Sequence, residues 1–273
     1  MAQDLRGGLT DPVGSGEASG WYIRGGVGLN AMSAGGLSQP DLAANGGSFI
    51  DQSVTNTASI DLGVGYRFNS KLRVDATWEL RTGANLKAVD NVRILNGRGQ
   101  TAADIYSSYD ANIHSQVALV NAYYDIGTWH GFTPFVGASL GVARNTISGL
   151  SGVNNSTINI YDNVAPYNLT SQINETSSSY SHTKTRYNLA WGLSAGLGYA
   201  VNENLTLEAS GRYLNLGNGA STSLINCTCG STGQPIKVGA MESIDMRLGM
   251  RWNFSDAPKA APMAIPRPVS TKF

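Results

Sequence analysis

The sequence predicts an all-β protein, an eight-stranded antiparallel up-and-down transmembrane β-barrel. Two observations carry this prediction. Apolar and polar residues alternate with a two-residue period in eight segments, and the connections between these segments alternate between short and long. A third observation agrees, because the chain has no apolar run of the ~18 residues that a membrane-spanning helix needs. Any membrane crossing is then expected to be made by strands.

The last segment, 242–254, shows the period most clearly. Apolar and other residues alternate along it as Ile244, Asp245, Met246, Arg247, Leu248, Gly249, Met250, Arg251, Trp252, Asn253 and Phe254. Successive side chains of a strand point to opposite faces, so one face would be apolar and the other polar. An apolar face toward lipid and a polar face toward the interior are typical of outer-membrane barrels.

Seven more segments follow the same period with varying regularity. They are 21–32, 59–68, 71–82, 113–126, 132–145, 186–201 and 204–216. Tight turns are expected at 68–71, 127–131 and 201–204, and long polar loops at 34–54, 83–110, 146–183 and 218–239. Short turns on one side and long loops on the other are the arrangement expected of such a barrel.

Composition sets limits on function. Charged residues make up 14% of the 273 residues, below the roughly 25% of soluble domains. The formal net charge is zero, which gives no reason to expect nucleic-acid binding. The predicted organisation is a leader (1–19), one barrel domain (20–254) and a Pro-rich tail (255–273).

Four short motifs carry a family resemblance. They are the opening Gly20-Trp21-Tyr22-Ile23-Arg24-Gly25-Gly26, Asn121-Ala122-Tyr123-Tyr124-Asp125, Phe135-Val136-Gly137-Ala138 and the closing Arg247-Leu248-Gly249-Met250-Arg251-Trp252-Asn253-Phe254. Over residues 20–254 the chain resembles the eight-stranded outer-membrane surface proteins of Gram-negative bacteria. This group includes opacity-like proteins, the OmpA membrane domain and small "porin family" surface antigens.

The resemblance implies an outer-membrane location with both termini periplasmic and contacts with outer-membrane lipid and lipopolysaccharide. It also implies recognition of the last strand by the barrel-assembly machinery, although residues 255–273 follow the terminal aromatic Phe254 here. In some relatives a mature N-terminus that begins with Ala is joined to peptidoglycan, and Ala2-Gln3-Asp4 is similar. A disordered leader is the alternative.

Strand parity assigns a charge network to the interior. Its predicted members are Arg24, Asp61, Arg67, Arg73, Asp75, Glu79, Arg81, Asp125, Glu208, Arg212, Asp245, Arg247 and Arg251. An eight-stranded barrel is just wide enough for side chains to fill, and buried charges must be paired. We therefore expect a lumen plugged by these residues, with a small passive or gated pore as the alternative.

The opposite parity assigns lipid-facing or interfacial positions to Trp21, Phe68, Tyr199, Leu248, Trp252 and Phe254. A soluble ligand-binding barrel would reverse the two faces, with apolar side chains inside. The apolar face reaches all eight segments and ends in aromatics, as an interfacial girdle would, which favours the membrane barrel.

No motif predicts catalysis, a cofactor or a metal site. Gly137–Gly141 and Gly192–Gly196 match G-x-S-x-G, but a nucleophile elbow requires a strand-to-helix turn, and both matches lie in predicted strands. An outer-membrane lipid hydrolase remains an alternative. However, the adjacent pair His114-Ser115 would point to opposite faces of a strand, which separates a base from its hydroxyl.

The long loops are the predicted functional surface. Loops of this length are far more than closure needs, so we expect a non-enzymatic envelope protein that displays them for partner or lattice contacts. Their aromatic and apolar residues could extend strands or contact a partner, and these are Ile105, Tyr106, Tyr109, Ile158, Ile160, Tyr161, Tyr167 and Tyr180. Cys227 and Cys229 lie in the last loop, where a local disulfide, free thiols and an intermolecular bond all remain open.

Overall fold

Eight strands form a barrel in the computed structural model, which describes residues 19–227 and 230–254. The barrel strands are β1 (Gly20–Ala34), β4 (Thr57–Arg67), β5 (Leu72–Arg81), β7 (Thr101–Asp125), β8 (Phe132–Tyr161), β10 (Lys184–Ala200), β11 (Leu205–Asn218) and β14 (Ala240–Asn253). Each pairs antiparallel with two neighbours, in the order β8-β10-β11-β14-β1-β4-β5-β7, and the β7–β8 pairing completes the ring. The predicted fold class and its eight strands are confirmed.

The remaining elements lie beyond one end of the barrel. They are β2 (Leu37–Ser38), α1 (Pro40–Ala44), β3 (Ser48–Val54), β6 (Ala84–Leu95), β9 (Leu169–Tyr180), β12 (Ile225–Asn226) and β13 (Lys237–Val238). Among the residues that the structure describes, no helix is long and apolar enough to cross a membrane.

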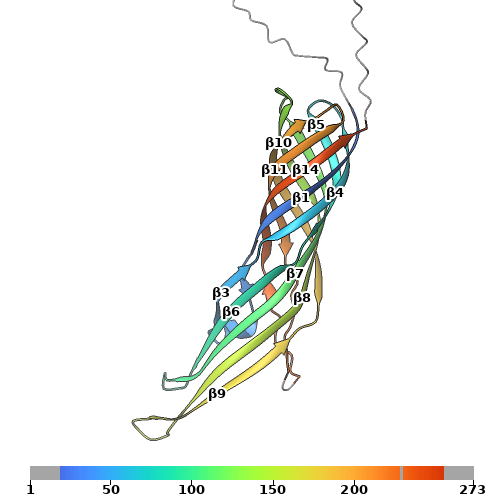
Figure 1. The fold of residues 1–273 in the computed structure, drawn as a ribbon. Helices are drawn as coiled ribbons and strands as arrows, with labels where there is room; N and C mark the ends of the chain where they lie inside the picture. The colour runs from blue at the N-terminus through green and yellow to red at the C-terminus, as the bar shows by residue number, and fades with distance from the viewer. Residues whose placement is uncertain (1–18, 228–229, 255–273) are drawn as a thin grey trace, which may run out of the picture.

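The opposite end carries the three short connections, and we call it the turn end. β1 begins and β14 ends there, as Figure 1 shows, and Tyr22 pairs with Asn253. In two of the turns an asparagine fixes the chain. The Asn69 Oδ1 accepts the amides of Lys71 and Leu72, and the Asn202 Oδ1 accepts those of Asn204 and Leu205. Asparagine side chains stabilise tight turns in this way.

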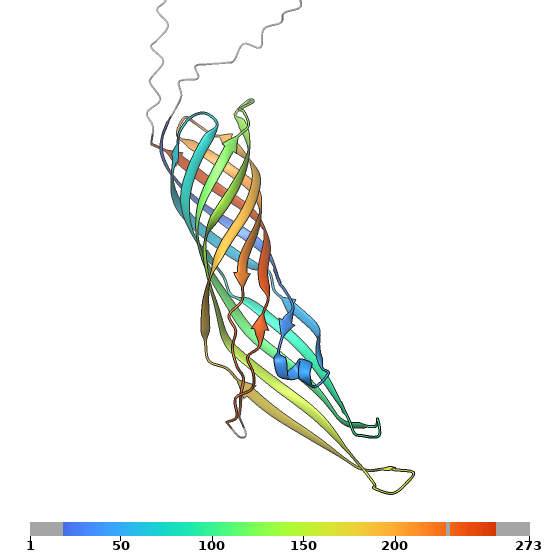
Figure 2. The ribbon, with the colours of Figure 1, turned by 180° about the vertical axis from the view of Figure 1, so that it is seen from behind.

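The long connections differ from the irregular loops expected at 83–110 and 146–183. Most of these residues are strand, because β7 runs for 25 residues and β8 for 30, far beyond the roughly 9–11 needed to cross a bilayer. The additional strands pair in the order β12-β9-β8-β7-β6-β3. They form a curved sheet, here called the extension, which Figure 2 shows leaving the barrel at an angle.

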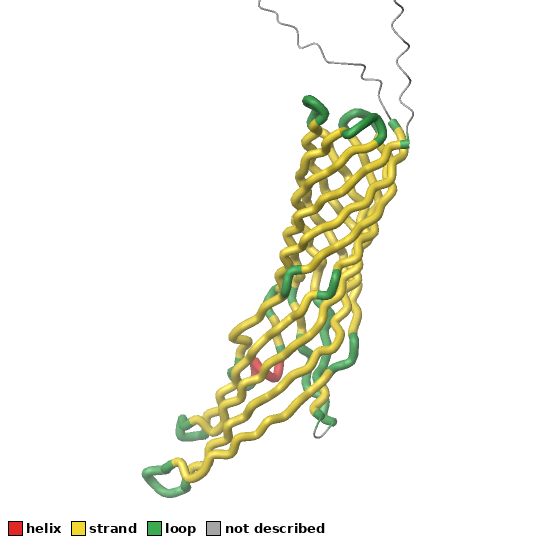
Figure 3. The backbone as a smooth tube through the Cα atoms, in the orientation of Figure 1, coloured by secondary structure: helices red, strands yellow, loops and turns green. Residues whose placement is uncertain are grey.

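Short interruptions divide the barrel from the extension. β3 passes into β4 through Thr55 and Asn56, β5 into β6 through Thr82 and Gly83, and β9 into β10 through 181–183. Figure 3 shows the first two as breaks in otherwise continuous strands. Backbone hydrogen bonds cross these interruptions. The Thr55 amide donates to the Asn85 carbonyl of β6 at 3.0 Å, and the Thr82 amide donates to the Ala58 carbonyl of β4 at 2.8 Å. Pairing therefore continues through the bend.

A bulge in β8 explains why the two-residue period is lost there. Gly149 has φ 63°, in the left-handed region that glycine adopts without strain, and the register with β7 shifts between Asp110 and Asn112. Ile147 and Leu150 are both buried, although they stand three residues apart. The buried face thus changes from odd-numbered to even-numbered residues at this point.

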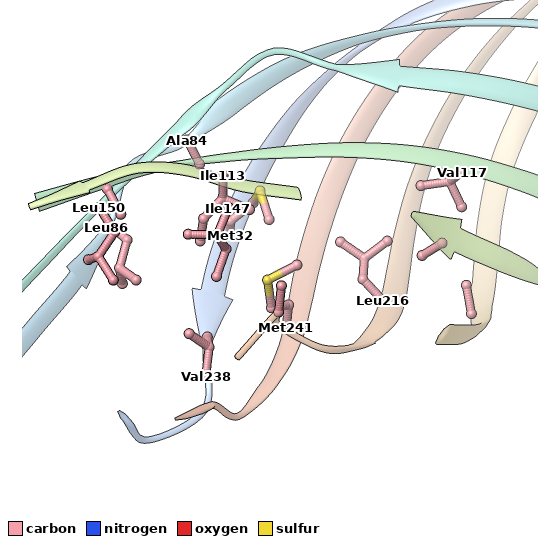
Figure 4. Packing of buried hydrophobic residues seen from close by; sticks show 14 of the residues in the cluster. Met32, Ala84, Leu86, Ile113, Val117, Ile147, Leu150, Leu216, Val238 and Met241 are labelled. Atoms are coloured by element: carbon pink, nitrogen blue, oxygen red, sulfur yellow. The ribbon is translucent and has the colours of Figure 1, made fainter. Parts of the chain in front are cut away.

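An apolar core fills the barrel mouth, where strand parity alone would predict polar side chains at the inward positions. This mouth cluster contains Met32, Ala84, Leu86, Ala111, Ile113, Val117, Leu119, Ala143, Ile147, Leu150, Ala190, Leu214, Leu216, Ala220, Leu224, Ile236, Val238 and Met241. Figure 4 shows Ile113, Ile147 and Met32 close together, with Val238 and Met241 below them. The segment 218–239, which carries β13, contributes Ala220, Leu224, Ile236 and Val238 to this cluster, and Leu37 of β2 packs against it. These apolar side chains close the barrel mouth.

Candidate functional site: barrel interior and extension

The outer surface of the barrel is apolar over about one membrane thickness of strand. The exposed apolar side chains run from Ile244 of β14 to Phe254, the residue after this strand, and on β1 from Trp21 to Leu29. The predicted girdle residues all lie on this surface: Trp21, Phe68, Tyr199, Leu248, Trp252 and Phe254 are exposed. Aromatic contacts join some of them to their neighbours, such as Phe132 against Tyr199 with ring centroids 4.8 Å apart.

Charged side chains fill the interior near the turn end. This turn-end cluster consists of Arg24, Arg67, Arg73, Asp75, Asp125, Glu208 and Arg251. Glu208 is its centre, since its carboxylate lies 2.9 Å from Arg251, 3.1 Å from Arg73 and 3.5 Å from Arg24. Four guanidinium groups meet three carboxylates. The least buried of them is Arg67, whose side chain is 23% exposed and lies 3.6 Å from Asp125.

A second charged layer, the middle cluster, lies between the turn-end cluster and the mouth. It consists of Asp61, Glu79, Arg81, Arg212, Asp245 and Arg247. Glu79 contacts three guanidinium groups, at 2.8 Å from Arg81, 2.6 Å from Arg212 and 3.3 Å from Arg247. Asp245 bridges Arg81 and Arg212, and Asp61 pairs with Arg247. Three positive and three negative groups are thus buried together.

Neutral polar side chains complete the turn-end cluster. They are not among the predicted interior residues, because the sequence prediction assigned only charged residues to the barrel interior. Tyr22 donates a hydrogen bond to Asp75 at 3.0 Å, Arg24 donates to the Tyr123 hydroxyl at 2.7 Å, and Asn121 donates to Asp75 at 2.7 Å. The Arg73 guanidinium lies 4.2 Å from the Tyr123 ring centroid. Strand parity could have identified the two tyrosines. Tyr22 and Tyr123 each stand two residues from an inward-pointing charged residue, so they point to the same face of the strand.

Glycine makes room for these rings. A Cβ on Gly137 would stand 2.5 Å from the Tyr123 Cδ1, and one on Gly65 would overlap the Tyr22 ring. Small inward residues therefore let long side chains cross a narrow barrel.

All thirteen residues assigned to the interior point inward, and each takes part in an ion pair. The sequence did not reveal that they separate into two layers, nor that an apolar layer follows. From the turn end outward, the barrel contains the turn-end cluster, the middle cluster and the mouth cluster.

The two outermost connections of the extension, 96–100 and 162–168, contact each other. The Gln100 Nε2 donates to the Tyr167 carbonyl at 3.1 Å, and the Arg98 guanidinium lies 4.1 Å from the centroid of the Tyr167 ring. Tyr167 has φ 59°, an uncommon conformation for a non-glycine residue that these contacts hold in place. Val164 beside it is 73% exposed.

A partly buried polar pair supports the sheet below these connections. The Tyr109 hydroxyl donates to Asp90 at 2.7 Å. Burial raises the pKa of Tyr109 well above its usual range, and the bond to Asp90 raises it further.

The sequence motifs with catalytic potential lie in ordinary strands. Ser139 lies in β8 opposite Gly192, and Ser194 lies in β10 opposite Gly137, so neither serine stands at a strand-to-helix turn. His114 pairs across β7 and β8 with Thr146. Within residues 19–227 and 230–254, no group of His, Cys, Asp and Glu side chains is arranged to hold a metal ion.

Three other predictions fall partly or wholly on residues that are not described. Cys227 is exposed, but Cys229, its partner in the local-disulfide alternative, lies outside the described residues. Ala2, residues 1–18 of the predicted leader 1–19 and the tail 255–273 lie outside them as well.

An apolar outer belt around a charged interior, closed by a ring of paired strands, defines a β-barrel membrane protein. The family model described as "Outer membrane protein beta-barrel domain" matches residues 7–230. The chain therefore belongs to this family of outer-membrane β-barrel proteins. The predicted family resemblance and the outer-membrane location are confirmed.

Curated relatives match over most of their length. The chain is 27% identical to the outer membrane protein PagN of Salmonella typhimurium, over 72% of this chain and 75% of that protein. It is 23% identical to a Rickettsia canadensis protein named "Putative adhesin", over 81% of each. An uncharacterized protein of Brucella abortus is 27% identical, over 77% of this chain and 72% of that protein.

Two solved structures are among those similar to this chain. The Pseudomonas aeruginosa outer membrane protein OprG is 17% identical, with a TM-score of 0.44. The match covers 88% of this chain and 98% of the OprG chain. Neisserial surface protein A is 16% identical, with a TM-score of 0.42. The match covers 87% of this chain and 100% of the chain of that protein.

Proposed function

We propose that this protein is a non-enzymatic surface protein whose plugged barrel holds a rigid β-structured extension outside the cell for contact with a partner. The observation that carries the proposal is the extension itself. Strands β7 and β8 continue far beyond the apolar belt, and a mouth cluster of packed apolar side chains supports them. A chain that needed only a closed barrel would not require this additional sheet.

The contacts between the two outermost connections support the same function. Because Arg98 and Gln100 hold the segment 162–168 in place, its exposed Val164 and half-buried Tyr167 form a fixed surface. Binding through a preorganised surface loses less conformational entropy than binding through a mobile loop. The names of the PagN and Rickettsia relatives describe an outer membrane protein and an adhesin, which agrees with a role in surface contact.

Adhesion of intact bacteria tests this function. Cells that produce the full chain are expected to adhere to cultured host cells or to surfaces coated with extracellular-matrix protein, and replacing 162–168 with a short Gly-Ser linker should abolish the gain. A linker that replaces the turn 127–131 is the matched control, because this connection lies at the turn end. Adhesion that is unaffected by the 162–168 variant would contradict the proposal.

The three layers inside the barrel support a plugged lumen. Two of them consist of ion-paired, largely buried side chains, and the third is apolar. An open channel would leave these charges unpaired, and each unpaired buried charge costs several kcal/mol. We therefore expect purified protein in planar bilayers to give no steady ohmic conductance of porin size, with at most rare, small openings. A stable, large conductance from homogeneous protein would favour the pore instead.

The orientation in the membrane follows from the two ends of the barrel. We infer that the turn end faces the periplasm and the extension faces outward, because short periplasmic turns and long extracellular loops are the rule for bacterial outer-membrane barrels. An epitope tag placed after Phe273 should therefore be inaccessible to antibody on intact cells and become accessible after permeabilisation. A tag inserted at 162–168 should show the opposite behaviour. Antibody binding to the C-terminal tag on intact cells would reverse the orientation.

A further inference from the structure

Strand β9 has an outer edge that is only partly paired. One of its edges pairs with β8 along its whole length. On the other edge, β12 pairs with Tyr180 and Ser179, and the Cys227 amide donates to the Ser178 carbonyl at 2.9 Å. From Leu169 to Ser177, no residue of the described chain pairs with this outer edge. We call this stretch the free edge.

The backbone groups along the free edge point outward at alternate residues. The Ser178 carbonyl faces away from β8, whereas the amide of Ser181 donates to the Leu150 carbonyl of β8. In an antiparallel pair the direction of the backbone groups alternates along the strand. Gln172, Asn174 and Thr176 therefore present their N–H and C=O groups to the free edge. Such a row is a template for another strand.

The other end of the extension sheet is protected, which makes the free edge distinctive. β3 contains a bulge between Phe49 and Asp51. The Gln52 side chain accepts a bond from the Leu37 amide at 3.1 Å and donates to the Ala34 carbonyl at 3.2 Å, so the chain beside β2 covers β3. Bulges and covering segments are the usual protections of edge strands. β9 contains no proline or lysine, and Glu175 is its one charged residue.

An apolar row reaches the free edge. Ile94 of β6, Ala103 of β7, Ile158 of β8 and Ile173 of β9 are consecutive partners on one face of the extension. Ile94 is 40% exposed and Ile173 is 42% exposed. The row therefore ends in an apolar side chain that lies beside unpaired backbone.

We propose that the free edge pairs antiparallel with the free edge of a second copy of this chain. The residue at the midpoint of Leu169–Ser177 is Ile173, so the register that pairs the whole free edge with itself places Ile173 opposite Ile173. The apolar row then continues from one sheet into the other, and apolar cross-strand pairs stabilise such contacts.

Charge agrees with this register. It places Glu175 opposite Ser171 of the second copy. Sliding the strands by two residues would place Glu175 opposite Ile173, and sliding them by four would bring the two Glu175 carboxylates face to face. Like charges directly opposite each other destabilise a strand pair. Among the described residues Glu175 has no ion-pair partner, so its own sheet does not neutralise it.

The direction of pairing determines where the second copy lies. This step rests on the proposed outward orientation of the extension. β8 runs away from the barrel and β9 returns toward it. In copies of one membrane, related by rotation about its normal, the β9 strands keep the same sense along that normal and therefore cannot run antiparallel to each other. Antiparallel pairing instead joins copies that face each other from two membranes. The occupant of the free edge is therefore the same protein on a neighbouring cell.

Disulfide trapping between two cell populations tests the pairing. Each population produces the full chain with Cys227→Ser, Cys229→Ser and Ile173→Cys, and carries a different C-terminal tag. Opposed residues of a non-hydrogen-bonded pair are close enough for a disulfide. Mixing the cells under mild oxidation should give a dimer that contains both tags. Glu175→Cys alone should give none, whereas Glu175→Cys cells mixed with Ser171→Cys cells should give the dimer.

Two controls separate the possible failures. Asn174→Pro removes one outward N–H and should abolish the dimer in the Ile173→Cys background, whereas Asn174→Ala keeps the N–H and should preserve it. A membrane-impermeant maleimide should label Ile173→Cys on intact, unmixed cells. Labelling without a two-tag dimer would overturn the pairing alone, and a dimer confined to one tag would overturn pairing between cells. Absence of labelling on correctly inserted protein would overturn the proposed outward orientation, and the pairing with it.

Discussion

Replacing Glu79 with alanine is expected to destabilise the folded barrel by about 3–5 kcal/mol, the typical cost of removing one partner from a buried ion pair. Glu79 lies in the middle cluster and contacts Arg81, Arg212 and Arg247, and its side chain is almost completely buried. Its removal leaves three guanidinium groups to share Asp61 and Asp245 in a space with little water. Equilibrium urea titrations of folding in lipid vesicles would measure the loss.

Two further variants separate the effect of the buried network from a general effect of losing a carboxylate. Glu175→Ala removes an exposed carboxylate that has no ion-pair partner among the described residues, and should change the free energy of unfolding by no more than about 0.5 kcal/mol. Replacing Glu79 and Arg212 together with methionine should recover part of the loss, because no single charge is then left without its partner. Equal losses in Glu79→Ala and Glu175→Ala would show that the middle cluster does not stabilise the barrel.

Leu248→Arg is expected to destabilise the barrel by about 2–4 kcal/mol, the cost of a basic side chain at the centre of the lipid-facing surface. Leu248 lies between Ala209 and Val27 on the outer surface of three adjacent strands and is 63% exposed. An arginine there would have to place its charge in hydrocarbon or reach to the membrane surface. The same folding titrations measure this loss.

The neighbouring arginine shows why the face matters. Arg247 is adjacent in sequence, but it points inward and pairs with Asp61 and Glu79. Leu248→Ala is the matched control, because it shortens the lipid-facing side chain without adding charge. If Leu248→Arg and Leu248→Ala were equally tolerated, Leu248 would not face lipid.

The barrel could be predicted from the sequence because one physical rule governs it. A strand between lipid and a charged interior must alternate, so the parity of β14 and β5 placed Arg73, Glu79 and Arg247 inside without further information. The partners could not be predicted. Arg212 and Glu79 are 133 positions apart in the chain, and their contact depends on barrel register and curvature.

The extension could not be predicted because its environment removes the alternation. Both faces of β9 are largely exposed, so polar residues such as Gln172 and Asn174 are tolerated on either side and no period develops. In β8 the bulge at Gly149 moves the buried face by one residue. The mouth cluster was missed for a different reason, since its members come from segments as distant as Met32 and Met241.

The mouth cluster also limits which parts of the protein can vary independently. Leu214, Leu216 and Met241 belong to barrel strands, yet they pack in one core with Leu86 and Val238 of the surrounding segments. The extension is therefore not a set of interchangeable inserts. Grafting a foreign loop in place of 83–110 or 218–239 would remove part of the core that seals the barrel. Sequence variation that leaves folding intact is expected to concentrate at 96–100 and 162–168, whose side chains lie beyond this core.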